Sequence, residues 1–116
     1  MLVTSWSTDH GRTGSKMTVI AVPNAITGID AVSLADDRQL LVCSPTTRQP
    51  CTWEPRSPLR AAVSSDGSTW AKVHDFDNAR AAEGYSRPAV NQTRDGLTHI
   101  TCTWRGERIR QVGIDL

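Results

Sequence analysis

The sequence predicts an all-β protein, and three observations support this fold class. No segment keeps apolar residues at the i, i+3, i+4, i+7 spacing that one face of a helix requires. Short runs rich in Val, Ile, Thr and Trp recur between clusters of turn-forming residues, which is typical of strands. One turn motif occurs twice, at residues 7–14 and 64–70, so part of the chain is repeated.

Nine strands are expected between the turn signals. Asp36-Asp37 and Asp95-Gly96 each lie between two strand-like runs and predict tight hairpins, because these residue types suit turn geometry. Arg105-Gly106-Glu107 is a glycine-containing loop between the last two runs. The expected strands are residues 2–6, 17–22, 29–34, 39–44, 59–64, 70–73, 86–93, 97–104 and 108–114.

The repeated motif predicts a hairpin with a fixed turn. Asp66-Gly67 lies between two strand-like runs, and the Ser64 hydroxyl is placed to bond the turn backbone. Ser7 and Asp9 stand 57 positions before Ser64 and Asp66 (64 − 7 and 66 − 9). A repeat of about this length that carries several short strands is typical of propeller blades.

Both copies resemble the Asp-box, Ser-x-Asp-x-Gly-x-Thr-Trp, of sialidases and of proteins with bacterial neuraminidase (BNR) repeats. The later copy is one residue shorter before Thr69, and the earlier copy has Gly14 where the motif has tryptophan. The resemblance implies a partial six-bladed β-propeller of about two blades. Residues 1–22 would end one blade, 29–75 form a full blade and 85–115 most of the next. An Asp-box marks a blade and not an active site.

The same resemblance suggests two site residues. Arg56, in Arg56-Ser57-Pro58-Leu59, is similar to the last of three sialidase arginines that clamp the substrate carboxylate, a task that suits the guanidinium fork. Tyr85 follows 29 residues later (85 − 56) and resembles the sialidase nucleophile, a phenol that a carboxylate activates. The alternatives are a surface arginine on a loop and a strand-end tyrosine with its hydroxyl in water.

Other residues argue against activity of this chain alone. Sialidases usually continue Tyr-Ser-Asp-Leu, whereas Arg87-Pro88 follows here. The acid/base aspartate, the activating glutamate and the first two arginines are not identifiable, and Asp30 is at most a substrate-facing residue. We expect a C-terminal fragment of a sialidase-like exo-glycoside hydrolase acting on carboxylate-bearing glycosides, inactive on its own. The alternative is a non-catalytic propeller remnant that binds carbohydrate or protein.

Composition limits the partners. A formal net charge of +1 over 116 residues gives no electrostatic case for nucleic acid or an anionic membrane. No signal peptide or membrane-spanning run is recognisable. Cys43, Cys51 and Cys102 lack the spacing of a zinc site and are expected to be buried or free thiols, so no metal or cofactor is expected. The remaining expected partners are a sialoside-like glycan and, through open blade edges, other copies of the chain.

The segment between Cys43 and Leu59 departs most from the strand pattern. Residues 44–55 hold three prolines without alternation, which predicts a long loop. An insertion is favoured over a binding element, because long loops cost little conformational free energy.

Overall fold

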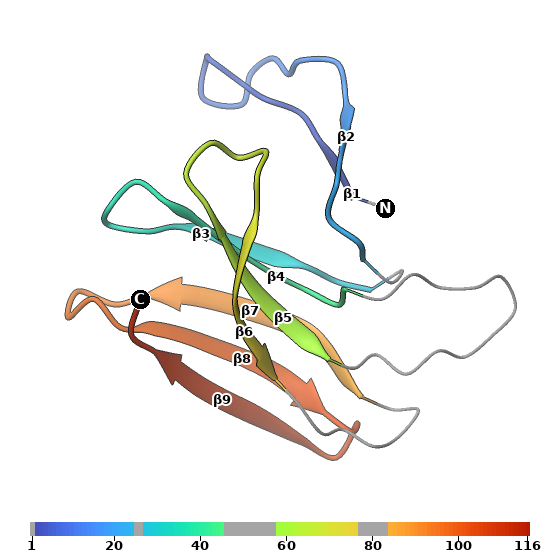
Figure 1. The fold of residues 1–116 in the computed structure, drawn as a ribbon, viewed down its shortest axis with the longest axis vertical. Helices are drawn as coiled ribbons and strands as arrows, with labels where there is room; N and C mark the ends of the chain where they lie inside the picture. The colour runs from blue at the N-terminus through green and yellow to red at the C-terminus, as the bar shows by residue number, and fades with distance from the viewer. Residues whose placement is uncertain (1, 25–26, 46–57, 77–83) are drawn as a thin grey trace, which may run out of the picture.

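The computed structural model describes residues 2–24, 27–45, 58–76 and 84–116, and within them it contains nine strands and no helix (Figure 1). The all-β prediction is therefore confirmed for this part of the chain. The strands are β1 (Leu2–Thr4), β2 (Thr18–Ile20), β3 (Asp30–Ser33), β4 (Gln39–Cys43), β5 (Leu59–Ser64), β6 (Ala71–Phe76), β7 (Tyr85–Gln92), β8 (Thr98–Trp104) and β9 (Arg108–Ile114).

The strands form three antiparallel sheets in chain order. β1 pairs with β2, β3 to β6 form a four-stranded meander, and β7 to β9 form a three-stranded meander. In Figure 1 the four-stranded sheet lies between the other two, and β3 lies beside β7. The two larger sheets thus contact each other through the first strand of each.

Strand bounds differ from expectation mainly in the first hairpin and in β6. β1 ends at Thr4 because the residues after it form hydrogen bonds with Ser15. The Ser15 hydroxyl accepts a 2.9 Å bond from the Trp6 amide, and the Ser5 hydroxyl donates a 2.7 Å bond to the Ser15 carbonyl. Such side-chain bonds replace ladder bonds. β6 runs on to Phe76, past the expected end at residue 73, because its ladder with β5 continues after a bulge at Val73 of β6.

Both faces of the four-stranded sheet are covered by apolar contacts. Residues 40–43 of β4 are consecutively buried, a pattern typical of a strand packed on both sides. One face packs on the three-stranded sheet through a cluster of Leu34, Leu40, Val42, Leu59, Ala61, Phe76, Tyr85, Ile100 and Cys102. The other face meets the first hairpin through Val22, Leu41 and Cys43, with Leu2, Ile20 and Trp70 beside them.

The first hairpin packs less tightly against the sheet. A cavity of about 320 Å³ lies between them, and Trp6 and Gly67 are among the residues that line it. The Trp6 indole lies so close to Gly67 that an added Cβ there would stand 2.6 Å from its Cζ2 atom. Trp6 remains 48% exposed, and Val3 and Val19, which pair across the hairpin, are 57% and 60% exposed.

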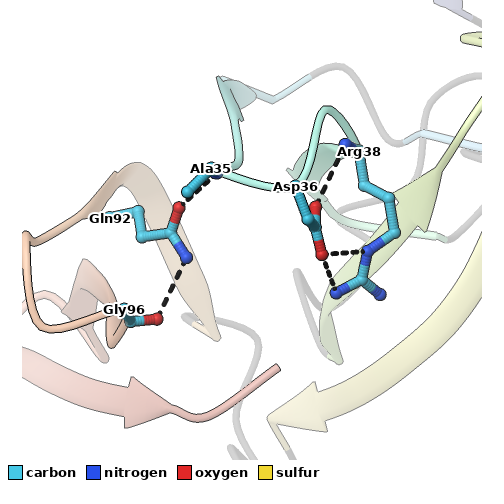
Figure 2. Close-up of polar contacts among 5 residues, drawn as sticks. All are labelled: Ala35, Asp36, Arg38, Gln92 and Gly96. Carbon is cyan, nitrogen blue, oxygen red and sulfur yellow. Dashed lines mark hydrogen bonds and ion pairs between the residues drawn. The ribbon is translucent and has the colours of Figure 1, made fainter.

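Polar bonds hold the two larger sheets in register at their turns. The Gln92 side chain accepts a 2.7 Å bond from the Ala35 amide and donates a 3.0 Å bond to the Gly96 carbonyl (Figure 2). Gln92 therefore ties the turn after β3 to the turn after β7. Asp36 stabilises the β3–β4 turn itself through a 2.6 Å ion pair with Arg38 (Figure 2).

Candidate functional site

Tyr85, the candidate nucleophile, begins β7 and is fully buried. Its ring packs edge-on to Phe76 of the neighbouring sheet, with the ring centroids 6.2 Å apart. Its hydroxyl oxygen accepts a 2.8 Å bond from a guanidinium nitrogen of Arg110 on β9. The tyrosine therefore lies in the core between the two larger sheets, and the alternative of a strand-end hydroxyl in water is wrong.

Strand register explains why Arg110 reaches Tyr85. Tyr85 is paired with Trp104, which is paired in turn with Arg108, and directly paired residues project to the same face of a sheet. Arg110 pairs with Cys102, two residues before Trp104, so it shares this face. This arginine was not among the predicted site residues, although its alternation with Arg108 along one strand was a visible signal.

A tryptophan and two arginines extend this face at the β8–β9 hairpin. The guanidinium carbons of Arg105 and Arg108 lie 5.0 and 5.4 Å from the centroid of Trp104, within the range of a cation–π contact. Arg105 and Gly106 both have positive φ, 56° and 69°, and the Glu107 amide donates to the Trp104 carbonyl at 3.0 Å. This is a type I′ hairpin turn in which an arginine occupies a left-handed position.

Asp30 begins β3 and is bonded to the neighbouring sheet. One carboxylate oxygen accepts from the Ala31 amide at 2.9 Å, and the other accepts from the Val90 amide of β7 at 2.8 Å. The register of β7 shifts between Ser86 and Ala89, and Arg87 within this bulge has a φ of 51°. Asp30 thus satisfies an amide next to the bulge.

The third candidate, Arg56, and most of the predicted loop 44–55 lie outside the described residues. Of the three candidates, Tyr85 and Asp30 lie on strands that contact each other, β7 and β3. The position of Arg56 relative to them is not described.

The two turn motifs share one pattern of hydrogen bonds. In each, the serine hydroxyl donates to the aspartate, at 2.8 Å for Ser7 and 2.9 Å for Ser64, and accepts from the glycine amide at 2.8 Å. In each, the aspartate accepts from the threonine amide, at 2.9 Å for Thr13 and 2.7 Å for Thr69. The extra residue before Thr13 is therefore absorbed without loss of the motif's bonds.

These bonds change the acidity of both aspartates. The Thr13 hydroxyl, the Thr13 amide and the Ser7 hydroxyl lower the pKa of Asp9 to about 2. The Thr69 and Ser68 amides, followed by the Ser64 hydroxyl, lower the pKa of Asp66 as well. A carboxylate that accepts several N–H and O–H bonds is stabilised in its charged form. Both turns are therefore organised around an ionised aspartate.

A comparison with models of protein families matches a BNR repeat-like domain over residues 1–100. The chain belongs to the BNR repeat-like domain family. No curated protein and no solved structure matches the chain significantly. The family assignment accounts for the repeated turn motif of this BNR chain and does not by itself specify a substrate.

The described part of this BNR chain offers neither a metal site nor a membrane-spanning helix. It contains no group of three or more His, Cys, Asp or Glu side chains that could hold a metal ion. No helix there is long and apolar enough to cross a membrane. Cys43 and Cys102 are buried free thiols, as expected, and burial raises the pKa of both; Cys51 lies outside the described residues.

Proposed function

We propose that the three sheets are successive blades of a BNR propeller of sialidase type, whose substrates are glycosides that carry a carboxylate. Residues 1–22, 29–75 and 85–115 would belong to three consecutive blades. The observation that carries this proposal is the pair of Asp-box turns with the same bonds, in a chain that the BNR repeat-like domain matches over residues 1–100.

A second recurrence supports the division into blades. In the β3–β4 turn, the Leu34 amide donates to the Arg38 carbonyl and Asp37 has a φ of 67°. In the β7–β8 turn, the Thr93 amide donates to the Leu97 carbonyl and Gly96 has a φ of 87°. Equivalent residues of the two turns are 59 positions apart (93 − 34 and 96 − 37), as are Cys43 and Cys102. The first hairpins of the two larger sheets are therefore the same unit, used twice.

In this proposal Tyr85 is the nucleophile, Arg56 holds the substrate carboxylate and Asp30 faces the substrate. A phenol suits an anomeric centre that already bears a carboxylate, because a carboxylate nucleophile would be repelled by it. Arg110 would orient the Tyr85 hydroxyl through the 2.8 Å bond. Attack on a sugar requires this hydroxyl to become accessible, so we propose that the chain alone does not hydrolyse sialosides.

A non-catalytic binding protein is the second candidate. Its support is the complete burial of Tyr85 in an apolar cluster, together with the use of both Asp30 oxygens in backbone bonds. In this candidate both residues stabilise the contact between two blades, and a glycan or protein binds elsewhere on the surface.

Two measurements on the purified chain separate these candidates. A fluorogenic sialoside should not be turned over; turnover that Tyr85→Phe abolishes would contradict the predicted inactivity and establish the nucleophile. Binding of free sialic acid should be detectable by NMR and should be weaker in Arg56→Gln than in Arg12→Gln, which removes an exposed arginine. Equal binding by the two variants would exclude Arg56 as the carboxylate clamp.

A further inference from the structure

The end of the β8–β9 hairpin concentrates positive charge around one aromatic ring. Arg105 and Arg108 both contact Trp104, and Arg110 lies on the same face, two residues beyond Arg108. None of the three forms an ion pair with a described residue, whereas Arg38 and Arg60 elsewhere in the chain each pair with an aspartate. The nearest carboxylate in sequence, Glu107, is exposed and is likewise unpaired among the described residues.

These guanidinium groups are held in place before any ligand arrives. Arg110 is anchored by its bond to the buried Tyr85 hydroxyl, and Arg105 and Arg108 are held against the indole. Ordering long side chains in advance reduces the entropy lost on binding. Arg108 and Arg110 are exposed, so their donors remain accessible to a ligand although one contact holds each side chain.

The backbone gives a second, independent indication. Arg105 occupies a left-handed position, φ 56°, in a type I′ turn where Asn, Asp or Gly is unstrained. Strain of this kind persists where the surrounding structure fixes it, and it is found preferentially at binding and catalytic sites. The turn is fixed by the bond from the Arg105 amide to the Gly84 carbonyl, directly before Tyr85.

We propose that Arg105, Arg108 and Arg110 around Trp104 form a binding site for an oxyanion, a carboxylate or sulfate group of an acidic saccharide. The planar guanidinium donates two parallel bonds to such a group, which suits carboxylate and sulfate equally. The saccharide as carrier rests on the proposed function, whereas the oxyanion rests on the three arginines alone. This site lies next to Tyr85 but does not require Tyr85 to react.

Calorimetry on the full chain tests the proposal with four probes: sialyllactose, a heparin-derived tetrasaccharide, lactose and inorganic sulfate. An acidic saccharide should bind at least tenfold more tightly than lactose and more weakly as salt is added. Arg108→Gln should lower that affinity about tenfold or more, as expected when a charge-assisted bond is lost. Arg94→Gln, the same change in the exposed β7–β8 turn, is the matched control and should bind normally.

Arg105→Asn gives the sharpest readout because its two effects oppose each other. Asparagine tolerates the left-handed turn, so the melting temperature should rise, while affinity for the acidic saccharide should fall. The Trp104 indole N–H resonance, assigned from Trp104→Phe, should shift on binding. An arginine with a purely structural role would not combine higher stability with weaker binding.

The outcomes are separable from those for the proposed function. Binding of neither acidic saccharide above the level of lactose, or unchanged affinity in Arg108→Gln, would overturn the oxyanion site. Binding of the sulfated tetrasaccharide, with or without binding of inorganic sulfate, but not of sialyllactose would support the site and count against sialosides as substrates.

Discussion

Replacing Gly67 by alanine should destabilise the chain more than the same change at any other described turn glycine with positive φ. Gly67 has a φ of 71°, and a left-handed backbone costs an L-residue about 1–2 kcal/mol. The new methyl group would also displace the Trp6 indole, which lies across this glycine. Gly67→Ala therefore removes a contact between the first hairpin and the four-stranded sheet in addition to straining the turn.

The size of the second effect follows from the exposure of Trp6. This side chain is 48% exposed, so roughly half of an indole surface, on the order of 100 Å², is buried. At about 25 cal/mol per Å², complete loss of that contact costs about 2.5 kcal/mol. We expect Gly67→Ala to lower the free energy of unfolding by up to about 3.5–4.5 kcal/mol, the sum of the two terms when the contact is lost completely.

Gly106→Ala is the matched control. Its φ is 69°, and an added Cβ meets nothing within 4 Å, so only the backbone cost of about 1–2 kcal/mol applies. Urea unfolding followed by circular dichroism, with Trp6→Ala as the second arm of a double-mutant cycle, measures the difference. In the Trp6→Ala background, the two glycine substitutions should cost the same. Equal costs in the wild-type background would refute the proposed Trp6 contact.

Three further predictions concern other parts of the chain. The pKa of Asp9 falls from 3.8 to about 2 on folding. The ionised carboxylate therefore stabilises the folded chain above about pH 4, and this contribution is lost as the pH falls to about 2. The difference in free energy of unfolding between wild type and Asp9→Asn should shrink over that pH range. Asp30→Ala should cost about 1–3 kcal/mol and speed hydrogen exchange at the Val90 amide, whereas Asp30→Asn, which keeps an acceptor oxygen, should cost less. Concentration-dependent self-association should appear in sedimentation and decrease in Val3→Thr/Val19→Thr; a cooperative, monomeric unfolding transition at micromolar concentration would contradict it.

Most of the strand pattern could be predicted because it depends on local chemistry. Turn-forming residues mark the ends of β5 and β9, Pro58 and Asp66 around the first and Gly106 and Asp115 around the second, and both strands match the expected residues 59–64 and 108–114. The first hairpin was predicted too long because Ser15, on the far side of the turn, replaces ladder bonds with side-chain bonds. A bond between residues ten positions apart has no signature in hydrophobic alternation.

The candidate site was harder to predict. A resemblance suggested Tyr85, but its burial depends on Phe76, which comes from another sheet, and on the way the two sheets pack. Its bond with Arg110 depends on the register of three strands, since a shift of one residue would turn Arg110 to the opposite face. The oxyanion site was missed for the same reason: Trp104, Arg105 and Arg108 form a cluster only once the turn between them is known.

The contact between the two larger sheets shows which part of a repeated unit is general and which is specific. Their first turns share backbone bonds and differ by 59 positions, so the turn itself is the general part. One of the bonds across the contact comes from the Gln92 side chain. The equivalent position one unit earlier (92 − 59) is Ser33, whose side chain is too short to bond two backbone groups in the same way. The last side chain of the strand, Ser33 in β3 and Gln92 in β7, therefore differs between the two sheets, whereas the turn that follows it has the same backbone bonds in both. Specificity between neighbouring units, like the proposed oxyanion site, thus depends on a few side chains on a repeated backbone.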